Sequence, residues 1–159
     1  MNFFENRDLW SSRMISNGAL DYLKATKTLQ TNPIFADYPY YFCAFQSIEL
    51  SLKAFLRAKG MTKNEMKGKF GHSIRKLYER AKKEGLSDLI ELTEEDEGML
   101  LQCGELFTQK VYQYTEVGMK SVITPVKITQ IMENLYNAIR PFAEEMNDIH
   151  FDKPTAVTE

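Results

Sequence analysis

Residues 38–59 read YPYYFCAFQSIELSLKAFLRAK, and this stretch is the most apolar part of the chain. Its large apolar side chains recur at intervals of three and four residues, which is the repeat of one face of an α-helix. Aromatic side chains make up much of that face, and each of them buries a large area on packing. We therefore predict a helix that forms the centre of the core. The residues of its apolar face are Tyr41, Phe42, Phe45, Ile48, Leu52, Phe55 and Leu56.

The residues around this central helix mark where it begins and ends. An earlier segment, residues 7–29, carries the same helical repeat, and Asn32-Pro33 predicts the turn between the two helices. Gly60 ends the central helix as a C-terminal cap. Thr62 and Glu65 then have the spacing of a capping box, which predicts a short helical turn.

Three more helical segments follow. Residues 73–83 form a short one, which Gly85 closes. A longer one begins at Thr93, where four consecutive acids occupy the first turn and complement the helix dipole. The last begins at Thr124-Pro125, a capping hydroxyl followed by proline at the first helical position. Pro141 lies within its repeat and is expected to kink or end it.

The pattern as a whole predicts an all-α fold. The sequence has no alternating strand pattern and no Asn-Gly or Asp-Gly hairpin turn. We predict an antiparallel up-and-down bundle of four long helices plus a short helix. A length of 159 residues fits one domain. We place that domain at residues 1–150 and expect residues 151–159 to form a flexible C-terminal tail.

Composition excludes several classes of protein. Hydrophobic residues make up 43% of the chain and charged residues 26%, as in globular proteins. No apolar run is long enough to cross a membrane. The first eight residues contain acids, whereas a signal peptide starts with basic residues and an apolar block. Two cysteines do not make a disulfide framework, so we expect a reducing, cytoplasmic location.

The sequence also lacks the spacing of known metal and cofactor sites. Its two histidines, His72 and His150, are not part of a Glu-x-x-His motif. Cys43 and Cys103 lie sixty residues apart, without clustered partners. No P-loop and no Gly-x-Gly-x-x-Gly motif occurs. We therefore expect neither a metal nor a cofactor.

Charge is distributed unevenly along the chain. Residues 59–84 hold nine Lys or Arg and three Glu, so their net charge is about +6 (9 − 3). Residues 88–97 hold six acids and no base. One interpretation is a solvated helix face beside an acidic helix start. The other is a patch that binds anions or nucleic acid, which the acidic stretch could screen or pair with.

Glu49 and Lys53 lie one helical turn apart within the central helix. They could form an (i, i+4) ion pair at the edge of the core face. Alternatively, they could form a polar pair that lines a groove beside His72. The sequence leaves both alternatives open.

Two stretches resemble the HEPN superfamily: residues 47–56, SIELSLKAFL, and residues 71–77, GHSIRKL, with Gly60 between them. The shared pattern is a Glu, then Leu-Lys-Ala, a glycine, and a Gly-His that starts a short helix. This match spans about a fifth of the chain, and the order of helices is similar beyond it. The resemblance implies an antiparallel helical bundle, usually dimeric. Many HEPN proteins cleave RNA as toxins or effectors in microbial defence, whereas others are nonenzymatic partners of nucleotidyltransferases or bind nucleotides or RNA.

The ribonucleases of this superfamily carry an Arg, four to six further residues, and then a His. That arrangement suits RNA cleavage, since His can act as general acid or base and Arg can stabilise charge on the phosphate. Neither His72 nor His150 has an Arg at the required distance, so we expect no HEPN ribonuclease activity. The residues at the three positions are Glu65, Met66 and Lys67 before His72, and Ala143, Glu144 and Glu145 before His150.

The sequence therefore favours a nonenzymatic HEPN-like protein that forms a homodimer and binds a nucleotide, RNA or a protein partner. A microbial defence or toxin–antitoxin-type system is the setting that the resemblance implies. No catalytic residue is predicted. The predicted anion-binding residues are Lys53, Lys69, His72, Arg75 and Lys76, and the predicted polar residues of a groove are Glu49, Tyr112 and Tyr114.

Two alternatives belong to other classes of function. The first is a divergent, metal-independent ribonuclease that uses His72 with Arg75 or Lys53. The second is a purely structural module for dimerisation or assembly, for which a large exposed apolar patch would be the mark.

Overall fold

The structure, a computed structural model, describes residues 10–32, 37–109 and 125–151. These residues are all-α and contain no strand, which confirms the predicted fold class. Two helical turns that are not α-helical complete the fold: the π-helical turn η1 (Met66–Phe70) and the 3-10 turn η2 (Leu86–Asp88). The α-helices are α1 (Ser12–Thr31), α2 (Asp37–Ala58), α3 (Lys63–Glu65), α4 (Ile74–Lys83), α5 (Glu94–Thr108) and α6 (Pro125–Phe151).

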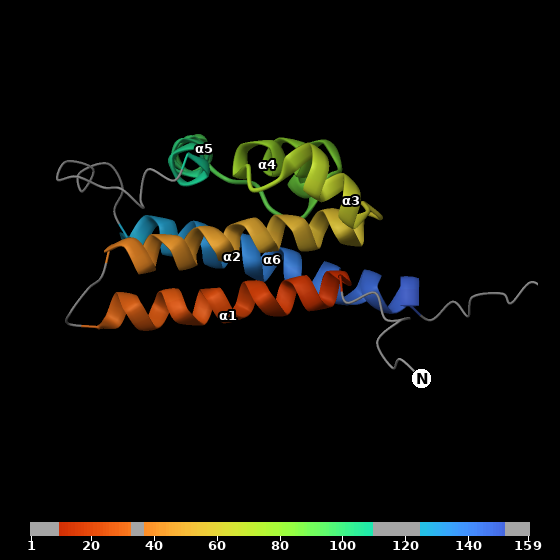
Figure 1. The fold of residues 1–159 in the computed structure, drawn as a ribbon, viewed down its shortest axis with the longest axis horizontal. Helices are drawn as coiled ribbons and strands as arrows, with labels where there is room; N and C mark the ends of the chain where they lie inside the picture. Colours follow the sequence, from red (N-terminus) through yellow and green to blue (C-terminus); the bar gives the residue numbers. More distant parts are fainter. Residues whose placement is uncertain (1–9, 33–36, 110–124, 152–159) are drawn as a thin grey trace, which may run out of the picture.

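The three long helices α1, α2 and α6 pack together along most of their lengths (Figure 1). α1 runs antiparallel to both of the others, because Arg57 at the end of α2 and Ala143 late in α6 bond to residues at the start of α1. α2 and α6 run parallel, and the hydroxyl of Tyr40 donates to the carbonyl of Pro125 where both begin. The shorter helices α4 and α5 cover the side of α2 away from α1, and Figure 1 views α5 along its axis.

α2 is the central helix, as predicted. Phe45, Ile48, Leu52 and Phe55 on its predicted apolar face are completely buried. Burial is not confined to that face, since all six residues from 51 to 56 are buried. Neighbours on several sides explain this, because α1, α6, α4 and α5 all contact α2. The polar side chains of α2 are therefore drawn into the interior together with its apolar ones.

The predicted helix ends are confirmed where the structure describes them. Gly60 and Gly85 take positive φ angles of 94° and 92°, which suit glycine after a helix. Thr62 and Glu65 form the predicted capping box, in which each side chain bonds to the other's backbone N–H. Thr93 caps α5 by accepting from the N–H of Asp96.

Pro141 does not end α6, which continues to Phe151. The expectation that the helix could stop there is therefore wrong. Proline removes the N–H that would bond to the carbonyl of Asn137, four residues earlier. Both Pro141 and Asn137 are exposed, so water can bind the carbonyl that proline leaves unpaired.

Some predictions concern residues that the structure does not describe. The second half of the predicted fourth helix, beyond Gln109, lies outside the described residues, and so do Pro33 and Thr124. Residues 152–159 of the predicted tail are also outside them, whereas Phe151 belongs to α6. Among the described helices, none combines the length and the apolar character that crossing a membrane requires.

The close approach of α4 and α5 depends on Gly104, and it provides a test of the fold. A Cβ at Gly104 would lie 2.9 Å from Cβ and Cγ2 of the buried Ile74, whereas a Cβ at Gly98 would meet nothing within 4 Å. We expect Gly104→Ala to lower the free energy of unfolding by about 1–3 kcal/mol through overpacking. We expect Gly98→Ala to raise it by about 0.5–1 kcal/mol, because alanine favours a helix.

Urea denaturation followed by circular dichroism measures both values. The two substitutions lie in the same helix and make the same chemical change, so each is the control for the other. Equal effects of the two variants would contradict the packing of α5 against Ile74.

Candidate functional site

Glu49 lies in the middle of α2 and is only 2% exposed. Its Oε1 accepts a hydrogen bond from Nζ of Lys53 at 2.6 Å and lies 3.0 Å from Nδ1 of His72. Lys53 is itself 6% exposed, so the ion pair is almost entirely removed from water. Buried charges are stable only when they are paired and hydrogen-bonded. The contacts of this carboxylate are therefore a structural requirement.

The backbone on either side of His72 explains how the ring reaches Glu49. Met66, at the start of η1, and Ile74, at the start of α4, are both fully buried and fix the two ends of the connection. Between them the chain turns at Gly71, whose φ of 54° suits glycine and whose N–H donates to the carbonyl of Met66. The connection therefore holds His72 over α2.

The structure answers the question that the sequence left open about Glu49 and Lys53. They form an (i, i+4) pair, and the pair also contacts His72. Neither interpretation required the pair to be buried. It is buried because helices pack on several sides of α2. The ammonium of Lys53 donates to Glu49 within the protein, and its predicted role in binding an anion stays a prediction.

His72 itself is on the surface. Its side chain is 77% exposed although Nδ1 lies against a carboxylate that is 2% exposed. The carbonyl of His72 accepts a hydrogen bond from Oγ1 of Thr108 at the end of α5, which adds a third element to the site. The Oε2 atom of Glu49 is buried and has no hydrogen-bond partner within the described residues.

Several cations near His72 in sequence have no ion pair with any described residue. Within the described part of the chain, no ion pair involves Lys67, Lys69, Lys76 or Lys83, and all four are exposed. Arg75 has only loose contacts, because its guanidinium lies 3.9 Å from Glu79 and from Glu105. These residues are neighbours in sequence on η1, on α4 and in the connection between them, and we call them the η1–α4 basic face: Lys67, Lys69, His72, Arg75, Lys76 and Lys83.

The acidic stretch, residues 88–97, pairs with one lysine of the basic stretch 59–84 and with one lysine of α6. Glu97 binds Lys82 at 2.8 Å, and Asp96 binds Lys127 of α6 at 2.9 Å. The hydrogen bond that Lys127 donates to Asp96 raises the pKa of Lys127. Among the described contacts, the acidic stretch forms no ion pair with Lys67, Lys69, Lys76 or Lys83.

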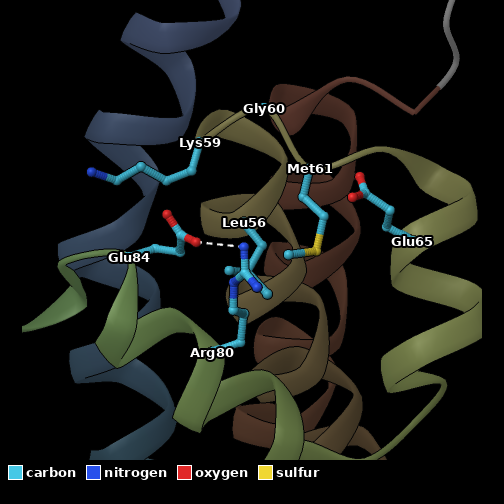
Figure 2. A pocket seen from close by; sticks show the side chains of 7 residues that line it. All are labelled: Leu56, Lys59, Gly60, Met61, Glu65, Arg80 and Glu84. Carbon is cyan, nitrogen blue, oxygen red and sulfur yellow. Dashed lines mark ion pairs between the residues drawn. The ribbon is translucent and has the colours of Figure 1, made fainter.

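A pocket of about 190 Å³ lies at the end of α2, and Figure 2 shows its lining. Arg80 there already binds Glu84 at 2.6 Å. The carboxylate of Glu65 accepts from the N–H of Thr62 at 2.9 Å, and this bond lowers its pKa. Lys59 extends toward α6, where its ammonium lies 5.1 Å from the ring centre of Phe142 (Figure 2). The charges of this pocket thus have partners within the protein.

Other candidate groups contribute less. Burial raises the pKa of Cys103 to about 12 and also raises that of Cys43, so neither is a thiolate at neutral pH. Within the described ranges, no group of three or more metal-ligating side chains occurs. Tyr112 and Tyr114, predicted as groove residues, lie outside the part that the structure describes.

Comparisons of the chain with protein-family models, with curated proteins and with solved structures give no match. The resemblance to the HEPN superfamily therefore stays a prediction. The interpretation of the site has to come from its own geometry, which is a buried ion pair that holds an exposed histidine beside unpaired lysines.

The ion pair makes a specific prediction about stability. Glu49→Gln or Lys53→Met alone leaves a charge buried without its partner, and we expect each to lower the free energy of unfolding by about 3–5 kcal/mol. We expect the double variant Glu49→Gln/Lys53→Met to cost much less than the sum of the two, because it removes both charges. Chemical denaturation of the four proteins completes the cycle. Additive losses would show that the two side chains are solvated independently.

Proposed function

We propose that the chain is a nonenzymatic, HEPN-like helical protein that binds RNA through its sugar–phosphate backbone at the η1–α4 basic face. The observation that carries this proposal is the set of exposed cations without an ion pair, within a stretch of net charge about +6 (9 − 3). Exposed cations without an ion pair attract polyanions.

The spacing of the cations favours a repeated anion over a single nucleotide. Lys76 and Lys83 lie seven residues apart on α4, which places them on one side of the helix and about 10 Å apart. Lys67 and Lys69 extend the positive charge onto η1. A mononucleotide needs a concave site with free polar groups, and the pocket in Figure 2 has its charges paired already.

His72 connects this face to the core. The contact with Glu49 fixes the ring, and the buried pair of Glu49 and Lys53 fixes that contact in turn. The cations on either side of His72 are therefore presented from a preorganised connection, which lowers the entropic cost of binding.

The homodimer stays a prediction. The apolar faces of α1, α2 and α6 pack against one another within a single chain. The described residues include only four large apolar side chains that are exposed. These side chains are Met14, Tyr38, Leu89 and Val126.

Binding of a fluorescein-labelled single-stranded RNA, followed by fluorescence anisotropy, tests the proposal. We expect Lys69→Ala/Lys76→Ala to weaken binding at least tenfold, since two phosphate contacts are lost. The slope of log Kd against log salt concentration should also decrease by about 1–2. The matched control is Lys24→Ala/Lys27→Ala, which removes the same charge from the exposed surface of α1. The control should bind as the wild type does.

Equal affinity of all three proteins would contradict the assignment of the η1–α4 basic face. The same samples on a denaturing gel test the ribonuclease alternative. Intact RNA after long incubation supports a nonenzymatic protein, whereas cleavage that His72→Ala abolishes would replace the proposal with the divergent ribonuclease.

A further inference from the structure

The chemistry of His72 goes beyond binding, because only one of its ring nitrogens is engaged. Lys53 donates to the carboxylate of Glu49, and an ionised carboxylate can only accept. Nδ1 of His72, at 3.0 Å from the same oxygen, is therefore the donor of its hydrogen bond. This tautomer leaves the lone pair on Nε2, on a side chain that is 77% exposed.

A carboxylate behind an imidazole does two things for a nucleophile at Nε2. It holds the ring in one tautomer and one orientation, and it stabilises the positive charge that the ring acquires when Nε2 forms a bond. Histidine with a free nitrogen is among the side chains that form covalent intermediates. Glu49 is well suited to this role, because burial and Lys53 keep its carboxylate in place.

The residues near His72 in sequence favour a phosphoryl group over other electrophiles. Lys69 and Lys76 lie three residues before and four residues after it, both exposed and without an ion pair in the described ranges. Gly71 precedes it directly, and a Cβ there would meet nothing within 4 Å, so a donor can approach over open backbone. Cations stabilise the charge on a phosphoryl group during transfer.

We propose that Nε2 of His72 is a phosphoryl acceptor that takes the group from an energy-rich donor, either an acyl phosphate or a phosphoramidate. The Nε2–P bond forms as the bond from phosphorus to the donor's oxygen or nitrogen breaks, and the bonding electron pair leaves with the donor. Nδ1 keeps its proton throughout, and the Glu49 carboxylate balances the charge on the ring. The inference rests on the proposed function in one respect, because the cations that would bind RNA also attract the phosphoryl donor.

Potassium phosphoramidate, which releases ammonia on transfer, is the probe for this proposal. The full-length chain is treated at neutral pH and then digested without exposure to acid. Mass spectrometry of the peptides measures how fast each histidine gains one phosphoryl group. The chain has only two histidines, so His150 is an internal control. We expect His72 of the folded protein to react at least ten times faster than the same residue of the chain unfolded in guanidinium chloride.

The variant Glu49→Gln tests the dependence on the carboxylate. We expect a rate at His72 that is about 10- to 100-fold lower, the range for losing the partner that orients a histidine. The comparison of folded and unfolded wild type needs no variant, so a failure of Glu49→Gln to fold leaves the test intact.

The outcomes separate this inference from the proposed function. Fast labelling of His72 without RNA binding would overturn RNA binding and support the acceptor. If the protein binds RNA but His72 is phosphorylated no faster in the folded chain than in the unfolded chain, the role of His72 as an acceptor is overturned and RNA binding is not. Equal rates at His72 in the wild type and a folded Glu49→Gln variant would also overturn it.

Discussion

Glu49 is only 2% exposed, so its carboxylate depends on donors inside the protein: Oε1 has two of them, whereas Oε2 has none among the described residues. Lys53, one turn along the same helix, neutralises its charge, and His72 reaches it from the connection between η1 and α4. Because removing either charge would leave the other buried, the pair constrains what can pack around α2. The position of the exposed imidazole follows from that constraint.

The same arrangement links the core to the surface. α2 is buried on several sides, so the charges in its middle can reach water only through a neighbouring segment. His72 provides that link, because one end of its ring touches the interior and most of its side chain is exposed. The fully buried Met66 and Ile74 keep the segment in place. The η1–α4 basic face thus adjoins a segment whose two ends are packed in the core, although its lysines are at the surface.

The sequence predicted the fold well, because helix ends and apolar repeats are local signals. The capping box at Thr62, the left-handed glycine at Gly60 and the start at Pro125 all depend on neighbouring residues. The burial of Glu49 and Lys53 could not be predicted, since it depends on how many helices surround α2. The contact of Glu49 with His72 was only one of the two interpretations that the sequence allowed. The spacing of residues along α2 does not show which loop packs against that helix.

The tautomer of His72 tests the central claim most directly. Long-range ¹H–¹⁵N correlation spectra of the uniformly labelled protein distinguish the two ring nitrogens at about pH 8.5, well above the usual imidazole pKa of about 6.5. The account predicts a proton on Nδ1 and an unprotonated Nε2, and predicts that Glu49→Gln weakens this preference. A proton mainly on Nε2 in the wild type would contradict the account, because Glu49 would then not hold the ring.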